Sequence, residues 1–485
     1  MEYAIISVVA CLTLFTLYLL QRQRRRNAII HAHGGGKITQ HYSWEPLTGI
    51  DFYMKTQMEI PWQYHHHQRY GHTFTVCSLL SQPTIYTIAP ENIRAVNSEK
   101  AWGIEPLRLE GMEYFCGQGF LTTDGEIWQH SRKLLKPTFA KANLLDLSIL
   151  SREFDQLVHD IPKEGTAVDL QPLFDTMFLN TSLKFLLGVD PKHESIGAPH
   201  TSDKFIDAFH SSLFLTMIRL LLGSAWRLVP QSKYLSSCQV AHDYLDYYIK
   251  KALLDSEQPA TQRTSSMLDA LSVQTKDLKY IRSQILQGMM ASQETTSALL
   301  GNACFLLSRN PHYWSQIQKE TMDVDSNNLT FDYLANLKLV KNILFETLRL
   351  YPNFPMLARI SLNDTILPRG AGPDGGLPVF VPKGTLVSMG YYGLHRNTQV
   401  FGDDIETFRP ERWEDIHPGP WEYMAFGGGN RSCMGQQKVL IEAAYVLIRL
   451  AKTFSTLESR DSSDWRGELK LSCKSANGCK VAIVA

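Results

Sequence analysis

The sequence has no excess of either charge and contains very little cysteine. Its 485 residues include 48 Lys and Arg against 48 Asp and Glu. Because nucleic-acid-binding domains are usually basic overall, this balance predicts that nucleic acid is not a partner. The eight cysteines show no tight spacing, which argues against a disulfide scaffold and predicts a reducing compartment. With 44% hydrophobic residues and no internal repeat, the composition is that of a globular chain.

Charge is missing altogether from residues 4–20, which are mostly Leu, Ile, Val, Phe and Ala. Glu2 precedes this apolar run, and the four arginines within residues 21–26 follow it. A cleaved signal peptide carries its positive charge before the apolar part, so the observed order favours a retained, single transmembrane helix. A cleaved signal and a buried core helix are the alternatives. We expect residues 1–26 to be a membrane anchor, with the body of the protein in the cytosol by the positive-inside rule.

The rest of the chain reads as a linker over residues 27–45, with three consecutive glycines, and a single domain over residues 46–485. Alternating runs predict two strands of a small sheet, and apolar periodicity with proline stops predicts long helices. The strands are expected over 73–76 and 84–88, and the helices over 277–310, up to 351 and over 434–454. The predicted fold class is therefore mainly α with a small β component.

One cysteine lies at a helix start, where the backbone can stabilise its thiolate form. Cys433 follows the glycines of residues 427–429 and lies at the start of the helix predicted over 434–454. The free N–H groups and the dipole at a helix start favour a thiolate and lower the pKa of the thiol. A thiolate is a nucleophile or a metal ligand, while a buried structural cysteine is the alternative. The glycines do not form a dinucleotide- or phosphate-binding motif, because Ser432 replaces the last glycine and no P-loop lysine follows.

The residues around this cysteine form the pattern Phe-x-x-Gly-x-Arg-x-Cys-x-Gly, filled by Phe426, Gly429, Arg431, Cys433 and Gly435. This pattern resembles the haem-binding loop of the cytochromes P450, the haem-thiolate monooxygenases. The resemblance implies that Cys433 is the axial ligand of the iron of haem b. It also implies that the other four residues form the loop around the haem.

Three charged residues extend the resemblance. Glu346 and Arg349 match the Glu-x-x-Arg of the family and share one face of a helix. Arg412, within residues 408–413, matches the arginine that joins this pair. In the family this core triad holds the haem loop. Buried charges that are paired from two directions can lock a loop in place.

Further positions resemble the residues that bind the haem propionates. Trp128 and Arg132 match the family's Trp and Arg on one helix, and Arg431 lies in the loop itself. Guanidinium groups suit this role because they donate two parallel hydrogen bonds to a carboxylate. Arg359 and His395 are also candidates, with an ordinary surface or turn role as the alternative.

An acid and an alcohol stand side by side in the long helix predicted over 277–310. Glu294 and Thr295 cost free energy within an apolar helix unless something uses them. The resemblance implies that Glu294 is a proton relay and that Thr295 is the hydroxyl on the dioxygen side, while a structural Ser/Thr patch is the alternative. Ser292 departs from the family, which usually has glycine there, so the resemblance does not imply the width of the adjacent groove.

Several segments resemble one branch of the family, the fungal alkane and fatty-acid hydroxylases. They are residues 46–52, 346–352, 370–376, 379–384 and 433–437. The branch implies a haem-dependent monooxygenase that uses dioxygen to hydroxylate an apolar substrate, such as a long-chain alkane or fatty acid, at or near the terminal carbon. Tailoring of a terpenoid, polyketide or related fungal secondary metabolite is the alternative, because relatives of this branch serve such pathways.

The resemblance also implies a partner and a location. Electrons are expected from NADPH through a flavoprotein, NADPH–cytochrome P450 reductase, in the same endoplasmic reticulum membrane. Lys133, Lys136 and Lys438 are candidates for docking it, and ordinary solvated lysines are the alternative. A haem-thiolate enzyme that rearranges peroxides and a haem protein without catalysis are the other hypotheses. The pair of Glu294 and Thr295 argues against the first of these.

Overall fold

Helices make up most of the structure, and the described strands form one six-stranded sheet and three smaller ones. The computed structural model describes residues 2–32, 36, 38–79, 82–162, 164–190, 197–255 and 266–484. The chain divides into two compact units. The sheet unit comprises Met1–Gly103, Phe354–Ile405 and His417–Ser432, and the helical unit comprises Ile104–Asn353, Glu406–Ile416 and Cys433–Ala485. The predicted fold class, mainly α with a small β component, is confirmed.

The sheet unit is built on the six-stranded sheet, whose strand order is β1-β2-β3-β9-β6-β4. Its strands are β1 Gln40–Tyr42, β2 Thr73–Cys77, β3 Thr84–Thr87, β4 Trp102–Gly103, β6 Met356–Ser361 and β9 Leu386–Gly390. The predicted strands β2 and β3 form an antiparallel pair, and β3 runs parallel to β9 with Ile85 opposite Val387. The unit also contains the paired strands β7 Thr365–Ala371 and β8 Leu377–Val381, and the helices α2 Ile50–Met58, α3 Ile60–Tyr70, α4 Pro90–Ser98, α16 Tyr391–Leu394 and α17 Thr398–Phe401.

The helical unit contains most of the helices. They are α5 Glu105–Cys116, α6 Gly125–Leu135, α7 Ser148–Asp160, α8 Leu170–Leu187, α9 Ser202–Leu222, α10 Ser232–Asp255, α11 Met267–Gln274, α12 Leu278–Leu307, α13 Pro311–Thr321, α14 Phe331–Asn336, α15 Lys338–Leu350, α18 Arg412–Asp415 and α19 Gln436–Thr453. Its strands are β5 Glu164–Asp169, β10 Thr456–Ser459, β11 Gly467–Leu469, β12 Cys473–Ser475 and β13 Lys480–Val484. The helices predicted up to 351 and over 434–454 correspond to α15 and α19.

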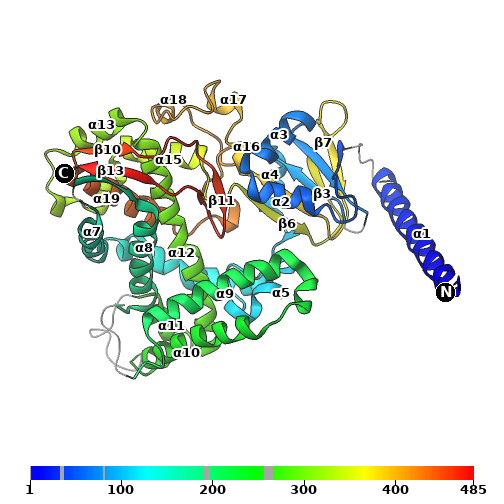
Figure 1. The fold of residues 1–485 in the computed structure, drawn as a ribbon, viewed down its shortest axis with the longest axis horizontal. Helices are drawn as coiled ribbons and strands as arrows, with labels where there is room; N and C mark the ends of the chain where they lie inside the picture. The colour runs from blue at the N-terminus through cyan, green and yellow to red at the C-terminus, as the bar shows by residue number, and fades with distance from the viewer. Residues whose placement is uncertain are drawn as a thin grey trace. The chain divides into compact units, whose positions relative to one another are not determined.

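Helix α12 runs through the helical unit and packs against α8, α10, α15, α19 and β12 (Figure 1). The Asp277 side chain caps its first turn by accepting a hydrogen bond from the Tyr280 N–H at 3.0 Å. The helix ends at Leu307, shortly before Pro311 begins α13. These two signals explain why the sequence predicts the helix so closely. Its buried length makes it a rigid support for any residue that it presents.

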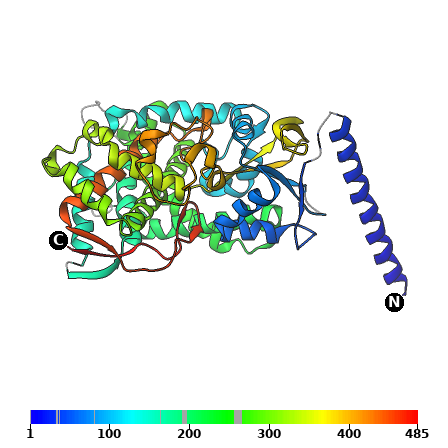
Figure 2. The ribbon, with the colours of Figure 1, turned by 90° about the horizontal axis from the view of Figure 1, so that it is seen from above.

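The N-terminal residues form one continuous helix, α1 Glu2–Ala32, which is drawn without a break in both views (Figures 1 and 2). It passes through the arginines and includes the first residues of the predicted linker. Leu14, Leu17 and Leu20 are exposed on it. Among the described residues, α9 is long and apolar enough to cross a membrane, but a third of its most apolar stretch is buried, and core helices share these properties. The membrane anchor and the boundaries at 26 and 45 therefore stay predictions.

Candidate active site

Cys433 differs from the other six cysteines whose side chains the structure describes, because its side chain is exposed while theirs are buried. It lies between the short 3-10 helix η6 (Gly429–Arg431) and α19, just before Gly435, which is the N-cap of α19. The backbone N–H of Gly435 forms a hydrogen bond with the Cys433 sulfur. An exposed thiol can reach a ligand, whereas the buried thiols cannot.

The expected lowering of the pKa of Cys433 is wrong. Although the side chain is exposed, protein atoms crowd around the sulfur, and the resulting desolvation raises the pKa of the thiol. The Gly435 N–H and the charge of Arg132 act in the opposite direction but are smaller effects. A thiolate here therefore needs a further positive charge next to the sulfur, and a coordinated metal ion deprotonates a thiol outright. In this respect the residues fit a haem iron.

The loop that leads to this cysteine depends on glycine. Gly429 has a φ of 64°, and a Cβ there would lie 3.0 Å from the Asn97 carbonyl oxygen. A side chain at Gly428 would lie 2.6 Å from the Trp421 ring. Only glycine meets both the left-handed conformation and the close approach at Gly429. Phe426, at the other end of the loop, is half-buried. The motif therefore has a physical reason in the sheet unit, independently of any ligand.

Helix α6 places two of the predicted propionate partners on the same side of the helical unit as the cysteine. The Arg132 guanidinium lies 6.0 Å from the centre of the Trp128 ring. Its charge opposes the rise in the pKa of Cys433, and burial lowers the pKa of the guanidinium itself. A partly desolvated arginine next to an exposed thiol is suited to an anionic group bound beside the sulfur.

The other three candidates lie in the sheet unit. His395 is fully buried, and its Nε2 accepts a hydrogen bond from the Met424 N–H at 2.9 Å. It thereby fixes the chain just before the loop, which is a turn role of the kind kept as the alternative. Arg359 lies on β6, where it is buried and donates to the Ala358 carbonyl at 3.0 Å. Arg431 is half-buried within η6. Contact of all three with a haem stays a prediction.

The three charged residues of the predicted triad are brought together in the helical unit, and all have fully buried side chains. Arg349 donates to both carboxylate oxygens of Glu346, from Nε at 2.9 Å and from Nη2 at 2.8 Å. The Arg412 Nε donates to Oε1 of Glu346 at 3.3 Å. Two groups that the sequence analysis did not assign complete the shell of donors: the Arg409 N–H at 3.1 Å and the Trp413 Nε1 at 3.0 Å.

This arrangement ties the segment around residues 407–413 to α15. Arg349 and Arg412 also donate to the Thr407 carbonyl, at 3.3 and 3.4 Å. A buried carboxylate is tolerated only when it is paired and hydrogen-bonded, and Glu346 meets this condition. The signal for Trp413 was present, because it directly follows Arg412 in the matched segment, but its ring nitrogen could not be paired with Glu346 from the sequence.

Helix α12 is buried on both sides of a short open stretch, Ala291–Thr295, which we call the α12 window. Residues 283–290 and 296–307 are buried, whereas Ala291 is exposed and the next four residues are partly exposed. Both predicted catalytic residues, Glu294 and Thr295, lie in this window. The Thr295 hydroxyl donates to the Ala291 carbonyl one turn back at 2.9 Å. The structure therefore opens the helix where the acid–alcohol pair stands.

Burial raises the pKa of Glu294, and the nearby Lys474 opposes this rise. Asn353 holds the window from outside, because its Nδ2 donates to the Thr295 carbonyl at 2.8 Å while its own carbonyl accepts from the Cys473 N–H at 2.7 Å. Sequence reasoning missed Asn353 and Lys474. The only available signal for Asn353 was its place after the proline that ends α15.

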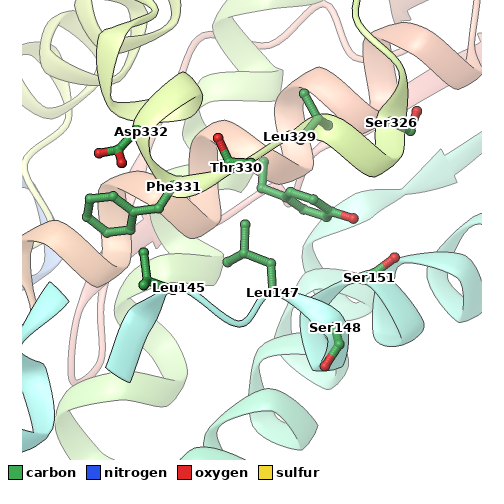
Figure 3. Close-up of a pocket in the computed structure, with 10 residues that line it drawn as sticks. Leu145, Leu147, Ser148, Ser151, Ser326, Leu329, Thr330, Phe331 and Asp332 are labelled. Carbon is green, nitrogen blue, oxygen red and sulfur yellow. The ribbon is translucent and has the colours of Figure 1, made fainter. Parts of the chain in front are cut away.

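A separate cleft of about 400 Å³ lies in the helical unit (Figure 3). Leu145, Leu147 and Phe331 contribute apolar side chains, and Ser148 and Ser151 contribute hydroxyls from α7. The remaining lining residues are Ser326, Leu329, Thr330, Asp332 and Tyr445. None of the predicted site residues lines this cleft.

One of the lysines proposed for partner docking is unsuited to it. Lys438 is buried, and its ammonium forms an ion pair with Glu442 at 2.5 Å, one turn further along α19. Burial of its stem against the Phe185 ring, 4.8 Å from the ammonium, explains the difference. Lys133 and Lys136 stay candidates.

A family model and several curated proteins that resemble this chain all carry the description cytochrome P450. The family model described as Cytochrome P450 matches residues 44–476. The chain is 35% identical to "Cytochrome P450 monooxygenase fsdH" of Fusarium heterosporum, over 97% of this chain and 86% of the relative. It is 36% identical to "Cytochrome P450 52-E3" of Starmerella bombicola, over 79% of this chain and 77% of the relative. It is 34% identical to "Cytochrome P450 monooxygenase FPY7" of Fusarium mangiferae, over 98% and 95%.

Proposed function

The chain belongs to the cytochrome P450 family, and we propose that this monooxygenase hydroxylates a long-chain alkane or fatty acid at or near its terminal carbon. The observation that carries the haem-thiolate part of the proposal is Cys433, an exposed cysteine at the end of a loop whose glycines the backbone requires. The family implies haem iron and electrons from a redox partner. The substrate class rests on the resemblance of the chain to the fungal alkane and fatty-acid hydroxylases.

Different residues of this chain are proposed to bind the iron, shape the loop and hold the propionates. When bound, a haem with a thiolate ligand supplies the oxidising power to attack a C–H bond. Cys433 would bind the iron, while Phe426, Gly429 and Gly435 shape the loop and the triad of Glu346, Arg349 and Arg412 holds the neighbouring chain. The residues that would hold the propionates, by the resemblance to the family, are Trp128, Arg132, Arg359, His395 and Arg431.

Glu294 and Thr295 in the α12 window are the residues proposed to transfer protons. Because burial raises the pKa of Glu294, this carboxyl can hold and release a proton closer to neutral pH than an ordinary glutamate. The Thr295 hydroxyl donates its hydrogen bond to the Ala291 carbonyl. The lone pairs of its oxygen therefore remain available as acceptors in the open part of the helix. Together they are placed to hold and pass on a proton at the open part of the helix.

The proposal includes a membrane and a protein partner. The exposed leucines of α1 and the arginines that follow them suit a single anchor in the endoplasmic reticulum membrane, with the catalytic body in the cytosol. NADPH–cytochrome P450 reductase is the electron donor proposed for this location. Alkaline carbonate extraction of microsomes tests the anchor, because a protein without residues 1–26 should become extractable while the full chain should not.

The substrate class is tested by titrating the purified ferric protein with a long-chain fatty acid and with the alkane of the same length. Displacement of water from the iron moves the Soret band from its low-spin to its high-spin position. A saturable shift supports terminal hydroxylation, and the product is then identified by mass spectrometry. No shift with either ligand, in a protein whose haem-thiolate spectrum is normal, contradicts it.

A second candidate function is tailoring of a bulkier fungal secondary metabolite. Ser292 favours it, because this residue departs from the usual family glycine and its buried Oγ has no hydrogen-bond partner within the described structure. An unsatisfied hydroxyl in the α12 window can accept or donate to a polar substrate. A spin shift with terpenoids or polyketides, and none with fatty acids, supports this alternative.

A further inference from the structure

A cluster of charged side chains lies behind the α12 window, inside the helical unit. The Lys474 ammonium, on β12, is 3.0 Å from Oδ2 of Asp175 on α8 and 3.9 Å from Oε1 of Glu294. The Lys474 side chain is 14% exposed, that of Glu294 is 17% exposed and that of Asp175 is 32% exposed. The cluster therefore connects the proton-relay candidate to a carboxylate that reaches solvent.

Asp175 is held firmly on the far side of Lys474. Its Oδ1 accepts hydrogen bonds from the Ser297 hydroxyl at 2.5 Å and from the Gln171 Nε2 at 3.1 Å. Its Oδ2 accepts from Lys474. With three donors, Asp175 cannot easily turn away, so it keeps the ammonium of Lys474 on its own side.

This geometry leaves Glu294 attracted to Lys474 without being hydrogen-bonded to it. The separation of 3.9 Å exceeds hydrogen-bond reach, but the Coulomb attraction persists at this distance. The carboxylate of Glu294 instead accepts from the Ser472 backbone N–H. A carboxylate held by a single backbone donor can still exchange its proton and turn, whereas one locked to an ammonium would stay ionised.

Several charges act on Glu294 with opposite signs. Burial and Asp175 raise its pKa, while Lys474, Lys470 and the Ser472 N–H lower it. The Cys473 thiol also faces it, and His210 on α9 faces Asp175 and Lys474. Lys474 and Asp175 therefore adjust the same carboxyl in opposite directions.

We propose that Lys474 is a positioning residue for Glu294, and that Asp175 withholds Lys474 from a direct hydrogen bond so that Glu294 stays able to exchange a proton. This inference rests on the proposed role of Glu294 as the proton relay. In each relay step Glu294 releases one proton toward the α12 window and regains one from solvent, with no electron transferred, and two such steps supply the two protons that one turnover consumes. Lys474 and Asp175 keep their own charge states throughout.

The experiment compares two variants that remove opposite charges. Lys474→Met and Asp175→Asn are made in the full chain, with Lys184→Met as the control, because Lys184 lies on α8 and donates to the Gly188 carbonyl instead. The protonation midpoint of Glu294 is followed by pH-difference infrared spectroscopy of the ferric protein without an electron donor. The Glu294 band is the carboxyl signal that disappears in Glu294→Gln.

We expect the midpoint to move to higher pH in Lys474→Met, because a stabilising positive charge is lost, and to lower pH in Asp175→Asn, because a repelling charge is lost and Lys474 is released toward Glu294. Coupling of electron consumption to product should fall about ten-fold in both, and Lys474→Arg should restore it in part. Lys184→Met should change neither quantity. A merely structural cluster would not move the midpoint in opposite directions.

Shifts of the same sign in both variants, or no shift, overturn the inference. If Lys474→Met does not fold, Lys474→Gln takes its place with the same expected sign. Failure of the proposed function is seen separately, because Glu294→Gln would then leave coupling unchanged. Uncoupling by Glu294→Gln together with wild-type coupling in Lys474→Met refutes only the role of Lys474.

Discussion

The buried carboxylate of Glu346 allows a graded prediction of stability. It accepts hydrogen bonds from Arg349, Arg412, the Arg409 N–H and the Trp413 ring nitrogen, at 2.8 to 3.3 Å. Trp413→Phe removes one donor and keeps an aromatic ring against Phe345, whose centre is 5.3 Å away. A hydrogen bond to a charged group contributes about 1.5–3 kcal/mol. Trp413→Phe should therefore lower the free energy of unfolding by about 2 kcal/mol.

Glu346→Gln should be much more damaging. It leaves the two fully buried guanidinium groups of Arg349 and Arg412 without a counter-charge. Removing one partner of a buried ion pair costs about 3–5 kcal/mol, which is a large part of the roughly 5–15 kcal/mol that stabilises a typical domain. We expect this variant to unfold well before the wild type, or to accumulate without haem.

The assay is urea unfolding of the full chain in detergent, followed both by circular dichroism and by the haem absorbance. The expected order of midpoints is wild type, then Trp413→Phe, then Glu346→Gln. Trp314→Phe serves as the matched control, because Trp314 is buried but its ring nitrogen has no hydrogen-bond partner among the described residues. A loss in Trp413→Phe as large as that in Glu346→Gln, or an unchanged midpoint in Glu346→Gln, would refute this account of the triad.

Three further outcomes are expected. Cys433→Ser should lose the haem-thiolate absorbance of the reduced carbon monoxide complex, and persistence of that band would show that another residue binds the iron. Thr295→Ala should uncouple electron consumption from product and release hydrogen peroxide instead, which a peroxide assay measures; fully coupled turnover would contradict its role. The hydroxyl and N–H of Thr48 lower the pKa of Glu45 from 4.5 to about 2, so Glu45 stabilises the turn above its unfolded pKa and this contribution is lost as the pH falls from 4.5 toward 2. Glu45→Gln should abolish that pH dependence in hydrogen exchange of the Leu47 and Gly49 amides, whose N–H groups donate to this carboxylate.

The parts of the fold that could be predicted depend on local signals. Asp277 and Pro311 bound α12 because a cap and a proline act within one turn of the helix. Glu346 and Arg349 were paired correctly because they are neighbours on one helix face. In each case the residues that interact are close in the sequence, so the pattern itself contains the geometry.

The parts that could not be predicted depend on contacts between distant segments. Asp175 and Lys474 form an ion pair although 299 residues separate them. The pKa of Cys433 was misjudged for a related reason: the helix start that lowers it is visible in the sequence, but the crowding that raises it comes from atoms elsewhere in the chain. The crossing of separate elements is set by packing, which a single sequence does not display.

The α12 window has a consequence for how such an enzyme changes over time. Buried residues anchor the helix on both sides of the window, whereas Ala291 within it is exposed and the next four residues are only partly buried. Substitutions at exposed positions usually alter stability by less than about 0.5 kcal/mol, whereas buried ones commonly cost several times more. The exposed position Ala291 can therefore change at little cost to folding, whereas Ser292, whose Oγ is buried, is more constrained by its surroundings. The same stretch of helix thus holds the proposed catalytic pair and a neighbouring position that tolerates substitution, so the surroundings of the pair can change without loss of the fold.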